Sequence, residues 1–78
     1  MTKEQFVEMI ANGRDIMFTI GTQGFTILTW TIEGISICKW DDDFHFYYET
    51  PEDVVESYIF DGLPLEESVD RIVITNYA

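Results

Sequence analysis

Apolar residues in the first twelve positions recur with the period of an α-helix. They share one face of such a helix, and polar residues occupy the other face: Phe6, Val7, Met9 and Ile10. Thr2, followed three residues later by Gln5, has the spacing of a capping box. Gly13 then offers a residue that enters the left-handed region freely and can end the helix. We therefore predict a helix over residues 2–12.

From residue 15 onward the apolar positions alternate with polar ones, which is the pattern of β-strands. The pattern predicts four strands, over residues 15–20, 25–32, 35–40 and 44–49. Glycine-rich or aspartate-rich turns separate them, at residues 21–24, 33–34 and 41–43. Because these connections are short, we expect the strands to form an antiparallel meander.

The last third of the chain returns to a helical pattern. Thr50 and Pro51 are typical of the N-cap and of the first position of a helix. The apolar stripe of this helix is predicted to comprise Val54, Val55, Tyr58 and Ile59. We expect Asp61–Gly62 to end it. A short helical turn is then predicted over residues 64–70, and a last strand over residues 71–76, whose partner the pattern does not identify.

These elements predict a single α+β domain over residues 1–78. It comprises an antiparallel meander of about four strands, an N-terminal helix, one or two C-terminal helices on one face, and a short last strand. Helices on one face leave the other face of the sheet open. The aromatic residues of the strands are expected to fill the core and to line that open face. Such a face suits contact with a protein or with a second copy of the chain.

Composition adds a strong charge to this picture. The 78 residues include fifteen acidic and four basic ones, for a formal net charge of −11. Nucleic acids and anionic lipids bind proteins largely through Lys and Arg, so we exclude both as direct partners and expect a basic protein partner. No segment has the pattern of a signal peptide or membrane span, and Cys38 is the single cysteine. We therefore expect a cytoplasmic protein.

The charge is concentrated in the second half of the chain. Residues 41–78 hold eleven acidic residues and a single basic one, Arg71. Two groups of acids share the spacing i, i+1, i+4 on predicted helical segments, which places each group on one exposed face. These candidate partner-binding residues are Glu52, Asp53 and Glu56, and Glu66, Glu67 and Asp70. Further candidates in a predicted turn are Asp41, Asp42 and Asp43. The alternative interpretation is a solvated face that serves solubility and the helix dipole.

Residues that carry chemistry are scarce. Cys38 and His45 lie on adjacent predicted strands, but no third group is placed to orient a nucleophile, so we expect no enzymatic activity. We also expect no cofactor. Zinc is the alternative, because carboxylate, imidazole and thiolate ligands fall near one turn. The candidate ligands are Asp41, Asp42, Asp43, His45 and Cys38. A calcium loop counted from Asp41 is excluded, because Phe46 stands at the position that needs glycine.

Two short motifs carry a resemblance. The segment Asn12–Gly13–Arg14–Asp15–Ile16–x–Phe18 and the segment Phe60–Asp61–Gly62–x–x–Leu65 resemble those of small acidic proteins of Gram-positive bacteria and their phages. In size and charge the chain is also similar to phage inhibitor proteins, which include anti-CRISPR proteins and other DNA mimics. Both resemblances imply a short, non-enzymatic α+β protein, and neither supplies a catalytic residue.

Taken together, these features predict an inhibitor of the phage or mobile-element type. It is expected to bind a basic nucleic-acid-handling protein, such as a CRISPR effector nuclease, and to block access of nucleic acid. Carboxylates would occupy the lysine and arginine sites that otherwise hold phosphates. Two alternatives stay open: a small structural or regulatory protein that self-associates through its exposed sheet face, and a metal-dependent binding protein.

Overall fold

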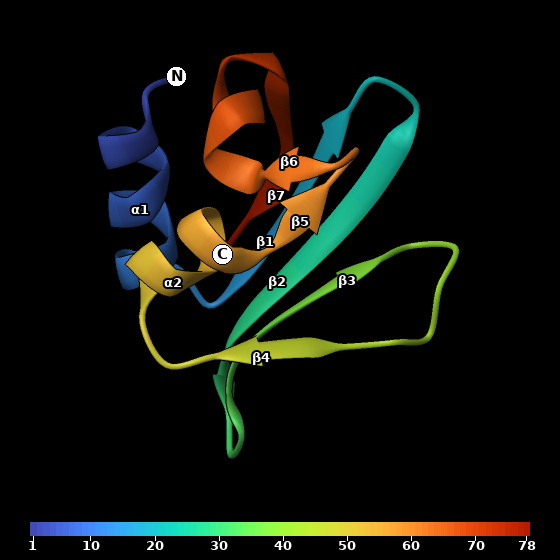
Figure 1. Cartoon of the computed structure of the whole chain (residues 1–78). Coiled ribbons are helices and arrows are strands. Elements are labelled where there is room, and N and C mark those ends of the chain that lie inside the picture. The colour runs from blue at the N-terminus through green and yellow to red at the C-terminus, as the bar shows by residue number, and fades with distance from the viewer.

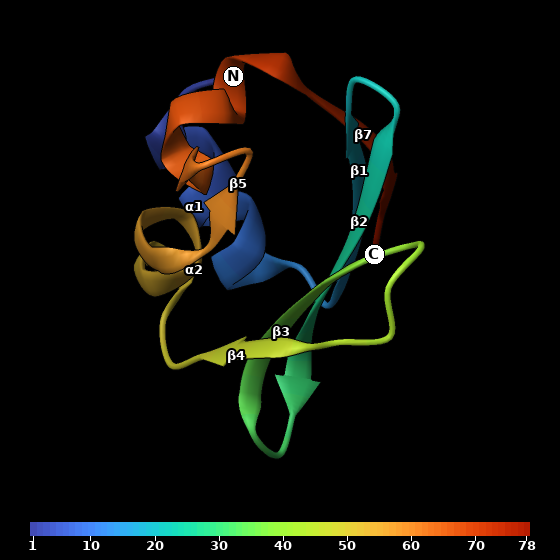
Figure 2. The ribbon, with the colours of Figure 1, turned by 45° about the vertical axis from the view of Figure 1, so that its right-hand side comes forward.

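A computed structural model describes all 78 residues and shows one antiparallel sheet with a layer of helices on one face (Figure 1). The strand order is β4-β3-β2-β1-β7. The strands are β1 (Asp15–Ile20), β2 (Gln23–Thr31), β3 (Gly34–Lys39), β4 (Phe46–Tyr48) and β7 (Ile72–Tyr77). The helical layer comprises α1 (Lys3–Asn12), α2 (Pro51–Ser57) and the 3₁₀-helix η1 (Leu65–Arg71). Figure 2 shows the helices on one side of the sheet and the other side uncovered. The predicted α+β class is confirmed.

Local signals account for the first helix. The Oγ1 of Thr2 accepts a hydrogen bond from the backbone N–H of Gln5 at 3.1 Å, and the Oε1 of Gln5 accepts one from the N–H of Thr2 at 2.8 Å. This reciprocal pair is the predicted capping box. Gly13 ends the helix as predicted, and its backbone N–H donates to the carbonyl oxygen of Met9, but its backbone is extended rather than left-handed, with φ −93° and ψ 171°. Its lack of a side chain instead admits Tyr77: a Cβ on Gly13 would lie 2.6 Å from the Cε1 of that ring.

The sheet contains one strand more than the meander. Strands β1 to β4 follow one another as predicted, but β4 is three residues long rather than six. The last strand, β7, pairs antiparallel with β1, and Ile72 lies opposite Ile20. This pairing places β1 inside the sheet and makes β7 an edge strand. The sheet therefore has five strands rather than about four.

The second helix ends earlier than predicted. It stops at Ser57, and Asp61–Gly62 forms the turn of a small hairpin between β5 (Ile59–Phe60) and β6 (Leu63–Pro64). Asp61 and Gly62 have φ values of 57° and 83°, the two positive values that a type I′ turn requires. Ile59 therefore leaves the predicted buried stripe and is 55% exposed.

The core lies between the helical layer and one face of the sheet. Fifteen buried apolar side chains form a single cluster there. The ring of Phe18 on β1 is its centre, stacked on Phe25 at 4.9 Å between centroids and edge-on to Phe6 of α1 at 5.3 Å. Each fully buried side chain of this size contributes about 1.5–3 kcal/mol relative to its exposed state. The core holds the helices against one face of the sheet. Their acidic residues lie on the opposite side of each helix, toward solvent.

Candidate interaction surfaces

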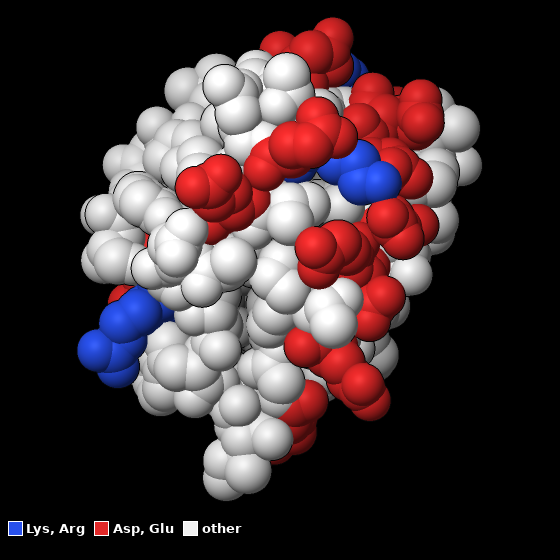
Figure 3. Space-filling view, turned by 90° about the vertical axis from the view of Figure 1, so that its left-hand side faces the viewer, with Lys and Arg blue, Asp and Glu red and all other residues white.

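The helical layer gathers acidic residues from three elements on one side of the molecule (Figure 3). We define the acidic helical surface as the carboxylates of α1, α2 and η1: Glu4, Glu8, Glu52, Asp53, Glu56, Glu66, Glu67 and Asp70. The bases of these three elements are Lys3 and Arg71. The six helical acids singled out in the sequence thus lie on two elements of the same layer.

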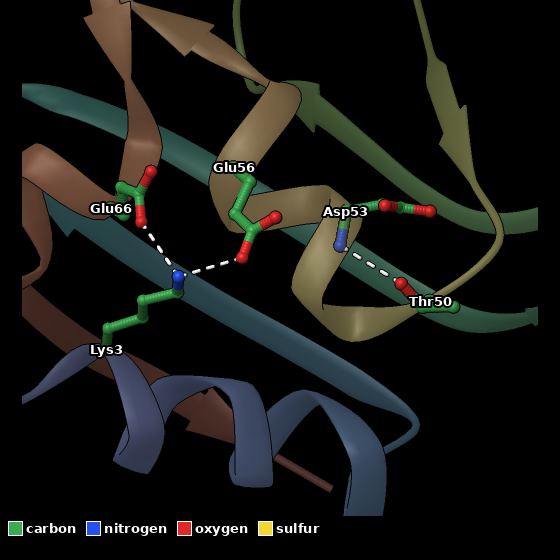
Figure 4. Close-up of polar contacts among 5 residues, drawn as sticks. All are labelled: Lys3, Thr50, Asp53, Glu56 and Glu66. Atoms are coloured by element: carbon green, nitrogen blue, oxygen red, sulfur yellow. Dashed lines mark hydrogen bonds and ion pairs between the residues drawn. The ribbon is translucent and has the colours of Figure 1, made fainter.

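Lys3 joins the two acidic groups. Its Nζ lies 2.8 Å from the Oε2 of Glu56 on α2 and 3.0 Å from the Oε1 of Glu66 on η1 (Figure 4). Hydrogen bonds to both carboxylates raise the pKa of Lys3 above its ordinary value of 10.5. The amine therefore stays charged at neutral pH and holds α1, α2 and η1 together. No local sequence signal connects these three residues, because each belongs to a different element.

A shallow acidic groove runs between α1 and α2. Its volume is about 390 Å³. Its lining residues are Lys3, Glu4, Val7, Glu8, Glu52 and Glu56. Glu4 and Glu8 were not among the predicted candidates, because acids and bases nearly balance over residues 1–40. Their spacing of four residues on the polar side of α1 was the signal that could have added them.

The N-terminus of α2 shows why its acids are placed there. The Oγ1 of Thr50 accepts a hydrogen bond from the N–H of Asp53 at 3.1 Å, as expected of an N-cap (Figure 4). Glu52 and Asp53 lie in the first turn, where the helix dipole favours negative charge. Glu52 is exposed, whereas Asp53 is half-buried. Glu52 is therefore the more accessible of the two carboxylates.

The three candidate acids of the predicted turn lie apart from this surface. Asp41, Asp42 and Asp43 belong to the connection between β3 and β4, which projects away from α1 in both views (Figures 1 and 2). Asp42 accepts a hydrogen bond from the N–H of Phe44 at 3.0 Å, and Asp41 accepts one from the Nε2 of Gln23 at 3.2 Å. Two of these three carboxylates therefore shape the loop.

The alternative zinc ligands do not gather into a group. No three His, Cys, Asp or Glu side chains are placed to hold a metal ion. His45 stacks against Tyr47, with ring centroids 6.3 Å apart. Burial raises the pKa of the Cys38 thiol, and the nearby carboxylates of Asp42 and Asp43 raise it further. This environment disfavours the thiolate, which is the form that attacks substrates and binds metals.

The uncovered side of the sheet carries two fixed tryptophans. The Nε1 of Trp30 donates a hydrogen bond to the Oδ1 of Asp15 at 2.9 Å, and the Nε1 of Trp40 donates one to the Oγ1 of Thr26 at 3.0 Å. Their side chains remain 59% and 53% exposed. We call this the open sheet face, and its large exposed residues are Met17, Trp30, Trp40, Tyr47 and Val73.

The chain thus presents an acidic side and an aromatic side. Its longest helix, α1, has ten residues, and no helix is long and apolar enough to cross a membrane. Comparisons with protein-family models, with curated proteins and with solved structures find no match for the chain. These two surfaces are therefore the candidate sites at which the chain contacts a partner.

Proposed function

We propose that this chain is a non-enzymatic acidic inhibitor of the phage or mobile-element type. It binds a basic protein that handles nucleic acid, such as a CRISPR effector nuclease, inside the cytoplasm and blocks access of the nucleic acid. One observation carries the proposal: the acidic helical surface holds eight carboxylates, and the bases of the same helices are Lys3 and Arg71.

The mechanism follows from charge. Clefts that hold nucleic acid are lined by lysine and arginine, which pair with phosphates. A rigid helical surface of carboxylates fits the same side chains and competes for them. Long-range attraction between a chain of net charge −11 and a positive cleft also speeds their encounter, particularly at low salt.

The carboxylates of this surface have different roles in the proposal. Glu56 and Glu66 are already paired with Lys3 and stabilise the helical layer. Glu52, Glu67 and Asp70 are exposed and form no ion pair within the chain. We assign contact with the partner mainly to these three residues.

A capture experiment tests the proposal. The tagged chain is incubated with a lysate of a Gram-positive bacterium that carries a CRISPR system, and bound proteins are eluted with a salt step. We expect a nucleic-acid-binding protein to elute at moderate salt, because exposed ion pairs are screened at separations beyond about 8–10 Å at physiological ionic strength. The purified partner should then lose binding to labelled nucleic acid when the chain is added.

A matched pair of variants locates the contact. The variant Glu52→Gln/Glu67→Gln/Asp70→Asn removes three charges from the acidic helical surface and leaves the ion pairs of Lys3 intact. The control Asp41→Asn/Asp42→Asn/Asp43→Asn removes three charges from the β3–β4 loop. We expect the first variant to weaken inhibition at least tenfold and to flatten its salt dependence, and the control to change it little. Equal effects of both variants would show that only net charge matters and would contradict the assigned surface.

A further inference from the structure

The edge strand β7 lacks the features that usually prevent a strand from pairing with another chain. Its sequence, Ile72–Val73–Ile74–Thr75–Asn76–Tyr77, has no charged residue and no proline. One side of its backbone pairs with β1, and the other side has no strand beside it. Natural proteins protect such an edge with lysine, proline or very short strands, because unpaired N–H and C=O groups recruit further strands.

The opposite edge of the sheet shows this protection. Strand β4 has only three residues, and the charges of Asp43 and Glu49 lie close to its two ends. Strand β7 has six residues, of which Val73 is 60% exposed and Tyr77 is 46% exposed. The two edges of one sheet therefore differ, and β7 is the one suited to pairing.

A groove lies next to the end of β7, on the same side of the sheet as the helices. Its volume is about 440 Å³, and one side of α1 forms its wall together with Tyr77. Its lining residues are Met1, Gln5, Glu8, Met9, Asn12 and Tyr77. Tyr77 is held in place by a hydrogen bond that its hydroxyl donates to the carbonyl oxygen of Met9 at 2.9 Å. An apolar segment that approached the β7 edge would have this groove to fill.

The distribution of charge bears on which protein can pair with the β7 edge. The chain carries −11, so two copies repel each other over most of their surface. The β7 edge and the adjoining wall of α1 contain one acid, Glu8, and the charges of Asp70 and Arg71, which precede the strand, cancel. Repulsion between two acidic chains is therefore weaker on this side than across the acidic helical surface.

We infer that β7 is a self-association edge, at which a second copy of this chain adds its own β7 in antiparallel orientation about a two-fold axis. The same strand then faces itself, as an isologous contact requires. The two five-stranded sheets become continuous, and the α1 helix of each copy meets the groove of the other. Met1 and Met9 supply adaptable apolar side chains for that contact.

A stable dimer at this edge needs both features, the strand and the wall of α1. A standard stable interface buries about 800 Å² on each partner. A strand of six residues is about 20 Å long, which alone gives less than this area. The wall of α1 adds to it, and the remaining repulsion between two acidic chains makes the dimer depend on concentration and salt. This inference does not rest on the proposed function.

Sedimentation equilibrium on the purified full chain tests the inference, at low and at high NaCl over a wide range of concentration. We expect the mass to rise from 9.1 kDa to twice that value, and to do so at lower concentration in high salt. Binding to a basic partner has the opposite salt dependence, so the two interactions are distinguishable. The amides of β7 should also exchange with deuterium more slowly at high protein concentration.

Two variants make the test specific. Val73→Lys places a positive charge on the β7 edge of both copies, and Tyr47→Lys places the same charge on the β4 edge. Circular dichroism establishes that each variant is folded. We expect Val73→Lys to weaken self-association at least tenfold and Tyr47→Lys to leave it within twofold. A wild-type chain that stays monomeric at every protein and salt concentration overturns the inference. A dimer that persists in Val73→Lys also overturns it, as does a dimer that is lost in Tyr47→Lys but not in Val73→Lys.

Discussion

The indole ring of Trp40 lies directly on the backbone of Gly24, on the side of the sheet that faces away from the helices. A Cβ on Gly24 would be 2.0 Å from the Cε3 of the ring, which is far inside van der Waals contact. The backbone N–H of Trp40 also donates to the carbonyl oxygen of Gly24 at 3.0 Å. The glycine therefore makes room for the tryptophan and fixes one end of the open sheet face.

Replacement of Gly24 by alanine should destabilise the protein. The ring has to move and lose its hydrogen bond to Thr26, and overpacking of this kind costs about 1–3 kcal/mol. Urea unfolding of wild type and Gly24→Ala, followed by circular dichroism, measures the free energy of unfolding. In a Trp40→Ala background, Gly24→Ala should lower the free energy of unfolding much less, because the ring that the new Cβ would meet is absent. An equal cost in both backgrounds would place the strain in the strand itself.

Removal of the Lys3 charge should destabilise the helical layer. In Lys3→Met, Glu56 and Glu66 lose the cation between them, and α2 and η1 repel each other. The pKa of Lys3 is raised in the folded protein, so its stabilising effect is fully present below its ordinary value of 10.5 and is lost as the pH rises above that value.

Urea unfolding curves for wild type and Lys3→Met should therefore differ by a constant amount from neutral pH to about pH 10, and should converge at higher pH. High salt should narrow the difference at neutral pH, because solvent and salt partly reach both ion pairs of Lys3. Lys39→Met makes the same change of charge at a lysine without an ion pair and serves as the control. A difference that persists unchanged at high pH would show that Lys3 acts through its aliphatic chain.

Gly62 should tolerate alanine poorly for a purely conformational reason. No heavy atom lies within 4 Å of a Cβ built on it, but its φ of 83° belongs to the left-handed side. We expect Gly62→Ala to lower the free energy of unfolding by about 1 kcal/mol. Asp61→Asn should be nearly neutral in the same assay, since asparagine also accepts the left-handed conformation. A neutral Gly62→Ala would mean that the hairpin relaxes freely.

Cys38 should react slowly with iodoacetamide near neutral pH. Its thiol has a raised pKa, so less thiolate is present than in an unfolded chain. The rate should rise with pH at a higher midpoint than the ordinary value of 9.0. Asp42→Asn/Asp43→Asn should lower that midpoint, whereas Glu66→Gln, remote in the helical layer, should not. Reaction as fast as that of the urea-unfolded chain would contradict this environment for Cys38.

The parts of the fold that the sequence predicts are those specified by neighbours in the chain. The capping box at Thr2, the N-cap at Thr50 and the alternation of the first four strands depend on residues a few positions apart. The prediction for Asp61–Gly62 was wrong because the same pair of residues can end a helix or form the turn of a hairpin. Here α2 already ends at Ser57, so the pair forms the turn between β5 and β6. The buried or exposed state of Ile59 follows from that choice.

The arrangement of the candidate surface was harder to predict. The two acidic groups were visible as a repeated spacing, but their junction at Lys3 depends on how α1 packs against α2 and η1. The pairing of β7 with β1 likewise depends on residues far apart in the chain, such as Phe18 and Ile74. Patterns of apolar residues give no register for contacts of this kind. The assignment of β7 as an edge strand therefore needed the tertiary structure.

The pairing of β1 with β7 also sets the order in which the chain can assemble as it is synthesised. A ribosome delivers β1 to β4 first, and these strands can form their hairpins while the rest of the chain is still being made. Strand β1 has only one neighbour at that stage, and the second edge of its backbone is unpaired. The nascent protein thus exposes an apolar edge until β7 leaves the exit tunnel, and closing this single long loop is the step expected to limit the rate of folding.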